Sequence, residues 1–307
     1  MTAQCIFKEK ESLFPKERWS LKNRTLTQLS HHNCATQAMT LKADTYIAIR
    51  LAMRARLLSF SLWTVGSLCV VVFLGSQFSG RQPGTVALDL GISTIRLLLP
   101  LLSTLLLQEL LSREFDRKLF LASLTYPRPR HRFLLSRIAA IGTILFCLLA
   151  ILAILLALLT DWIDQEVTQS RAPALGLPYL VTVAFIGLDL LVVLAIGTLL
   201  SVLATTPSFV LIGTLGFMLV ARSFSAIVAL LTRDSTLVGH TEAYQSSLSI
   251  IGYLLPDLAA LDVRMIALYG EWSFLPSDWA LRVVATLAYT AALFAMAVWA
   301  LNRKRFS

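Results

Sequence analysis

The sequence predicts an all-α integral membrane protein with six transmembrane helices. Of its 307 residues, 56% are hydrophobic and only 15% are charged, whereas a soluble domain carries about 25% charged residues. Six apolar stretches are each long enough to cross a bilayer as a helix, which takes about 20 residues. The basic residues cluster beside these stretches, so the net charge of +9 indicates orientation in a membrane and not binding to nucleic acid.

The N-terminal part of the chain differs from the rest. Residues 1–40 are polar and are predicted to form a poorly ordered cytoplasmic tail. They lack the early apolar stretch of a cleaved signal peptide, and Met39 is a second possible start. The membrane domain is expected over residues 41–307 and begins with an interfacial helix over residues 45–56. The apolar stripe of this helix consists of Tyr46, Ile49 and Met53 and continues into Leu57, the first residue of the next predicted helix.

The six spans follow from the hydropathy of the chain. They are predicted over residues 57–75, 86–110, 134–159, 177–204, 208–231 and 279–301. Most Lys and Arg residues fall in the N-terminal tail, in the loop between spans two and three, and after span six. Because basic residues are retained on the cytoplasmic side, both termini are expected to be cytoplasmic.

The segment between spans five and six is apolar but unsuited to a simple crossing. Four of its residues disfavour a span: Pro256, Asp257, Asp262 and Arg264. Each charge near the middle of a bilayer costs about 2.5 to 3.5 kcal/mol on insertion scales. We therefore expect short external or re-entrant helices over residues 247–270. Asp257 is expected to N-cap one helix that ends near Gly270.

Three charged residues lie deep within the predicted spans. Arg96, Asp189 and Arg222 are each roughly 14 to 18 Å from the expected outer end of their helix, at about 1.5 Å per residue. Similar depth allows Asp189 to pair with Arg222 or with Arg96. Two interpretations stay open: a structural ion pair that satisfies costly charges, or a polar lining of a substrate path.

The loop between spans two and three, residues 111–133, is basic and regularly patterned. Its first part predicts a short helix, with Glu114 and Asp116 in the first turn and apolar residues at near-helical spacing. Pro127 and Pro129 end this helix. If this loop only set the membrane topology and contacted anionic lipid, its positive charge would be sufficient and no ordered pattern would be needed. The helix–stop–helix pattern indicates, in addition, a docking surface. The apolar residues are Phe115, Leu119, Ala122 and Leu124.

Two stretches resemble a known family. "REFDRKLFLASLTYPRPRHRFLLSRIAAIG" resembles the cytoplasmic segment of type-2 ABC exporter permeases. "YLLPDLAALDVRMIALYG" is similar to the extracellular segment of permeases in the multicopper-enzyme-maturation-like branch. The residues that match the first pattern are Glu114, Asp116, Pro127, Arg130, Phe133, Leu134, Leu135 and Arg137.

The resemblance implies the permease subunit of an exporter in a bacterial inner membrane. In that family the loop between spans two and three is a coupling helix that binds a cytosolic ABC ATPase. Two permease subunits, identical or paralogous, assemble with two ATPase subunits. This sequence has no GxxxxGK[ST] motif, so ATP and Mg are expected on the partner ATPase and no cofactor on this chain. The residues expected to couple to the ATPase are Glu114, Phe115, Asp116, Leu119, Phe120, Pro127 and Arg130.

Other classes of function find less support in the residues. The sequence has no HExxH or GxSxG motif, and a single carboxylate lies deep in a predicted span, so no catalytic residues are expected. Neither the four cysteines nor the four histidines show ligand spacing, so no metal site is predicted. The alternative to an ABC permease is a non-ABC secondary transporter or an integral membrane scaffold. The residues do not specify a substrate.

Overall fold

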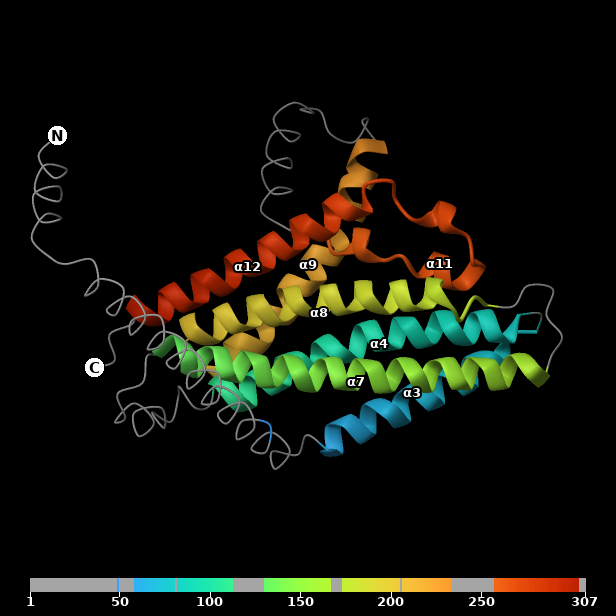
Figure 1. Cartoon of the computed structure of the whole chain (residues 1–307), viewed down its shortest axis with the longest axis horizontal. Coiled ribbons are helices and arrows are strands. Elements are labelled where there is room, and N and C mark those ends of the chain that lie inside the picture. The colour runs from blue at the N-terminus through green and yellow to red at the C-terminus, as the bar shows by residue number, and fades with distance from the viewer. Residues whose placement is uncertain are drawn as a thin grey trace, which may run out of the picture. The chain divides into compact units, whose positions relative to one another are not determined.

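The structure is a computed structural model that describes residue 49 and residues 58–80, 82–112, 130–166, 173–204, 206–233 and 257–303. All regular structure in these ranges is helical, which confirms the all-α prediction. Five helices are long and apolar enough to cross a membrane (Figure 1): α3 Leu58–Phe78, α4 Pro83–Leu107, α7 Arg130–Glu166, α8 Leu177–Leu203 and α12 Trp279–Arg303.

The predicted fifth span corresponds to α9, Pro207–Arg233. Within α9, the apolar helix is Pro207–Ser223, which is shorter than the five helices that are long enough to cross a membrane. Five membrane-crossing helices are thus supported by length and composition, and a sixth crossing stays a prediction.

Several predicted features lie outside the described residues. They are the tail over residues 1–40, the interfacial helix over residues 45–56 except Ile49, and part of the external segment, with Pro256. Ile49 itself is helical. Most of the expected ATPase-coupling residues lie outside as well: Glu114, Phe115, Asp116, Leu119, Phe120 and Pro127. Arg130 is the first residue of α7.

Two helices extend beyond their apolar stretches. α4 begins at Pro83, where proline suits the first helical turn, and continues into a π-helical turn, Gln108–Ser112. α7 has 37 residues and is about 55 Å long, whereas a bilayer core is about 30 Å thick. The hydropathy prediction ended these helices at their polar residues, although polar residues continue a helix readily where it leaves the hydrocarbon.

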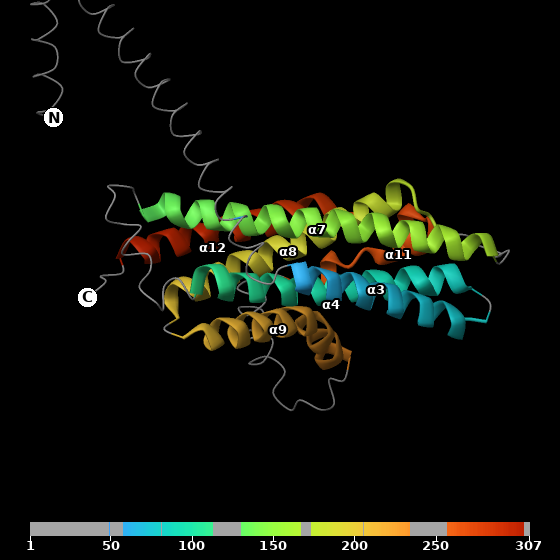
Figure 2. The same ribbon diagram turned by 90° about the horizontal axis from the view of Figure 1, so that it is seen from below.

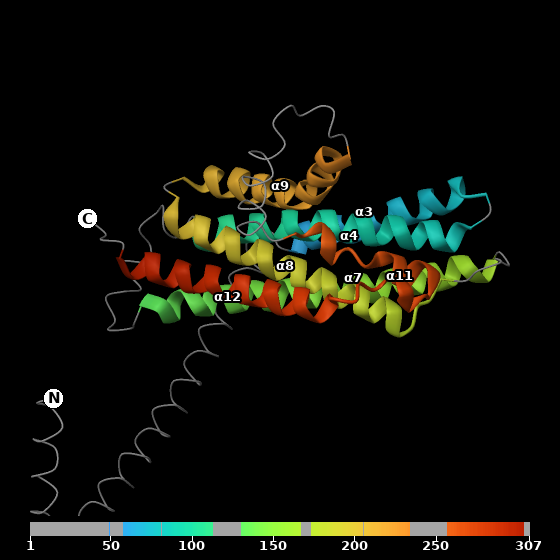
Figure 3. The ribbon, with the colours of Figure 1, turned by 90° about the horizontal axis from the view of Figure 1, so that it is seen from above.

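The helices pack around α4, which contacts α3, α7, α8 and α9. Figures 2 and 3 show α4 between α9 on one side and α7 on the other, and α12 lies against α8. At one position α4 approaches α7 closely, because a Cβ atom added to Gly91 would overlap the side chain of Leu156. The buried face of α4 therefore links the other helices of the bundle.

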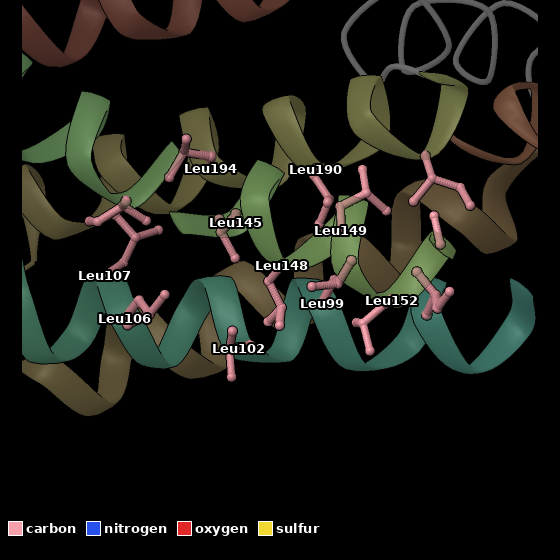
Figure 4. Close-up of a cluster of buried hydrophobic side chains, with 14 of the residues drawn as sticks. Leu99, Leu102, Leu106, Leu107, Leu145, Leu148, Leu149, Leu152, Leu190 and Leu194 are labelled. Carbon is pink, nitrogen blue, oxygen red and sulfur yellow. The ribbon is translucent and has the colours of Figure 1, made fainter. Parts of the chain in front are cut away.

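The core between α4, α7 and α8 consists mainly of leucine. The side chains of Leu99, Leu145 and Leu190, from three different helices, lie in one cluster (Figure 4). Since lipid is as apolar as leucine, van der Waals packing, and not the hydrophobic effect, holds such helices together within a membrane. Further leucines of this cluster are Leu102, Leu106, Leu107, Leu148, Leu149, Leu152 and Leu194.

Three short helices precede α12. They are η3 Ala259–Leu261, α11 Arg264–Tyr269 and η4 Trp272–Phe274. α11 lies beside α8 (Figure 1) and also contacts α4. Gly270 ends α11 with a φ of 71°, a left-handed conformation that glycine adopts without strain.

Candidate functional site

Asp189 is the most deeply buried acidic group of the described residues. It lies 12 positions after Leu177, about 18 Å along α8, and the residue is 1% exposed. Its Oδ2 accepts a hydrogen bond from Nη2 of Arg222 at 2.5 Å and lies 3.8 Å from Nη2 of Arg96. The predicted choice between the two arginines does not arise, because both contact the same carboxylate oxygen.

Arg96 joins Asp189 to a second carboxylate. Its Nη1 is 2.6 Å from Oδ1 of Asp262, and its Nη2 donates to the backbone carbonyl of Leu258 at 3.4 Å. The backbone carbonyl of Arg96 accepts a hydrogen bond from Arg222 at 3.0 Å. One arginine of α4 thus connects α8, α9 and the segment that follows α9.

Arg264 connects the same segment to the beginning of α4. Its Nη1 lies 3.0 Å from Oδ1 of Asp89 and donates to Oγ of Ser93 at 2.8 Å. Its Nε is 3.5 Å from Oδ2 of Asp262. The side chains of Arg264 and Asp89 are 38% and 43% exposed, so this end of the arrangement is far more open than Asp189.

Together these residues form one chain of alternating charge, which we call the charge network. The order of contacts along it is Asp89, Arg264, Asp262, Arg96, Asp189 and Arg222, and Asp189 is its most buried member. Three carboxylates and three guanidinium groups give it no net charge. Charges inside a membrane are tolerated where they pair with one another and face the protein interior. Arg96 and Asp189, whose side chains are buried, meet both conditions.

The segment over residues 257–270 is docked against the helices, in contrast to a freely exposed external helix. Leu258, Leu261 and Ile266 are buried in one cluster with residues of α8 and α9. Near its other end, the carbonyl of Ala267 accepts a hydrogen bond from the backbone N–H of Ala174 at 3.0 Å. The residues from α8 and α9 in this cluster are Phe185, Val192 and Ala221.

The prediction of one helix from Asp257 to Gly270 is partly wrong. Oδ1 of Asp257 accepts hydrogen bonds from the backbone N–H groups of Ala259 and Ala260, so Asp257 contacts the first turn of a helix, but the N-cap residue of that helix is Leu258. That helix is η3, and it ends at Leu261. Asp262 interrupts it because its carboxylate binds Arg96 and also accepts from the backbone N–H of Arg264 at 3.4 Å. A separate helix, α11, then leads to Gly270.

Hydropathy did not connect the outer residues of the network with the intramembrane charges. A signal was present, however, because Asp89, Ser93 and Arg96 are spaced four and three positions apart. This spacing places them on one face of a helix. A polar stripe of this kind on an apolar span indicates that the stripe faces protein and not lipid.

The network links α4, α8 and α9 with the segment that follows α9 through paired charges. Asp189 is held by two arginines through Oδ2. Arg96, in contrast, lies within reach of two carboxylates at 2.6 and 3.8 Å. It can therefore shift between Asp262 and Asp189 without leaving a buried guanidinium unpaired.

Comparison with models of protein families finds no match to this chain, and comparison with curated proteins finds none. Among the described residues, no three or more His, Cys, Asp or Glu side chains are grouped as ligands for a metal ion.

Proposed function

We propose that this chain is the membrane-spanning permease subunit of an ATP-binding cassette exporter. The observation that carries the proposal is the position of α4. α4 holds Asp89 and Arg96 of the charge network, and its π-helical end, Gln108–Ser112, leads directly into residues 113–129. α7 begins on the far side of these residues and packs back along α4. A force applied to residues 113–129 would therefore act on the helix that anchors the network.

The charges of α7 support a cytoplasmic position for residues 113–129. The first turns of α7 carry Arg130, Arg132 and Arg137, and its last turns carry three acids, Asp161, Asp164 and Glu166. The helix dipole favours the opposite arrangement, with acids first and bases last. The observed arrangement, with basic residues first and acidic residues last, agrees instead with a membrane helix whose first turns are cytoplasmic, because Lys and Arg are retained in the cytoplasm. The basic end of α7 is thus the end that faces a cytosolic ATPase.

The charge network gives such a permease an element with two arrangements. Transport requires the helices to move, and a buried charge that loses its partner costs about 3 to 5 kcal/mol. Exchange of Arg96 between Asp262 and Asp189 avoids this cost, because both carboxylates stay close to a guanidinium group. In this proposal ATP and Mg bind to the partner ATPase, and a second permease copy or paralogue completes the assembly in a bacterial inner membrane.

The proposal is tested by purifying the tagged chain together with its ATPase. Phe115 and Phe120 are the expected aromatic anchors, and such anchors contribute about 2 kcal/mol each, roughly thirtyfold in affinity. The double variant Phe115→Ala, Phe120→Ala should lose the ATPase and still insert in the membrane, because the basic residues that set orientation are kept. Phe146→Ala is the matched control, since Phe146 is 41% exposed near the middle of α7. Full retention of the ATPase by the double variant would contradict the proposal.

A further inference from the structure

Large exposed aromatic side chains gather from the last residue of α11 to the first residue of α12. Tyr269, Trp272, Phe274 and Trp279 are each 41 to 50% exposed. The rings of Tyr269 and Phe274 are 5.8 Å apart between centroids, which folds this segment back on itself. We call residues 269–279 the aromatic segment.

α12 relates the aromatic segment to the thickness of a bilayer. Trp279 and Trp299 lie near its two ends and are 46% and 55% exposed. Twenty positions separate them, about 30 Å along a helix, which equals the thickness of the hydrocarbon core. Tryptophan is enriched at both boundaries of that core. At the far end, the guanidinium of Arg303 lies 4.4 Å from the ring of Trp299, as expected for an arginine that reaches from a helix end toward the headgroups.

The other end of the aromatic segment is tied to the chain that precedes α8. Ala267, two residues before it, is hydrogen-bonded to Ala174, three residues before the beginning of α8. The nearby end of α7 carries Trp162, which is 54% exposed. Leu275, within the aromatic segment, packs against the buried cluster that contains Leu258, so the segment is held to the helices at both ends and in between.

We propose that the aromatic segment binds the headgroup–acyl boundary of the lipid bilayer. The rings of Trp272 and Trp279 lie at this boundary, where an apolar ring and a polar N–H are both satisfied. Residues 257–268, which run from the aromatic segment toward Arg96, then lie within the membrane. Their charged side chains are compatible with that depth because Asp262 and Arg264 are paired with α4. The inference does not depend on the proposed transport function.

The test uses tryptophan fluorescence of the full chain in phospholipid vesicles. One protein keeps Trp272 alone, with the five other tryptophans replaced by phenylalanine. Its matched control lacks all six natural tryptophans and carries Phe146→Trp, at an exposed position near the middle of α7. Each protein is measured in lipid brominated near the carbonyl end of the acyl chain and in lipid brominated near its terminal methyl.

The expected result is a larger loss of Trp272 fluorescence with the shallow bromines than with the deep ones. The Phe146→Trp control should show the opposite order. Strong quenching of Trp272 by aqueous iodide, without an effect of either brominated lipid, would place the segment in water and overturn the inference. No quenching by lipid or by iodide would also overturn it, because the segment would then be covered by a second copy or by another protein.

Discussion

Asp189→Asn removes one charge from the most buried point of the network while keeping the shape of the side chain. In the native arrangement Asp189 faces two guanidinium groups, at 2.5 Å from Arg222 and 3.8 Å from Arg96. After the change, Arg96 keeps Asp262 at 2.6 Å. Among the described contacts, Arg222 keeps a carbonyl oxygen at 3.0 Å. The loss therefore falls mainly on Arg222.

The size of the effect follows from this asymmetry. Removing one partner of a buried ion pair costs about 3 to 5 kcal/mol, because the remaining charge is left uncompensated. Arg222 is still 22% exposed along its side chain, which favours the lower end of that range. At roughly 2 °C or more per kcal/mol, we expect the apparent melting temperature to fall by about 6 °C.

The assay is thermal unfolding of the purified protein in detergent, followed as loss of the monodisperse peak. Arg222→Gln in the Asp189→Asn background should recover part of the loss, because it removes the unpaired cation. Asp161→Asn is the control, since Asp161 is exposed and its side chain binds Gln165, and it should change little. Additive losses in the double variant would refute the pairing, because contacting residues are expected to couple by 0.5 to 3 kcal/mol, roughly.

Two further predictions concern orientation and packing. Reporter fusions after Gln165 should be active outside the cell and fusions after Arg128 inside it; an external signal at Arg128 would contradict both the orientation and the coupling role. Gly91→Ala should destabilise the protein by about 1 to 3 kcal/mol, because the new Cβ overlaps a leucine of α7. Gly66→Ala has open space and should be neutral or stabilising through helix propensity, so equal effects at the two glycines would refute the packing argument.

The long helices were predictable because hydropathy reports directly on lipid exposure. Spans predicted over residues 177–204 and 279–301 correspond to α8 and α12 within two residues. Depth along a helix was also informative, since it placed Asp189 level with Arg96 and Arg222. Both inferences require only the position of a residue along a single straight helix. They do not require knowledge of how the loops fold back on the helices.

The outer half of the charge network was not predictable in the same way. Asp262 and Arg264 lie in a segment whose path depends on tertiary contacts of Leu258 and Ile266 with other helices. A sequence window cannot tell whether such a segment stays outside the membrane or docks between spans. The end of the helix before Asp262 also depends on a tertiary contact, because Asp262 forms an ion pair with Arg96 of another helix.

The most direct test of the central claim is ATP hydrolysis by the purified complex in lipid nanodiscs. The claim is that residues 113–129 couple this chain to a cytosolic ATPase. The complex with the unchanged chain should hydrolyse ATP at a rate different from that of the ATPase alone. With Glu114→Lys, which reverses a charge in the expected docking helix, the rate should return to that of the free ATPase. Identical rates for the free ATPase, the unchanged complex and the Glu114→Lys complex would contradict the claim and leave residues 113–129 with a role in orientation only.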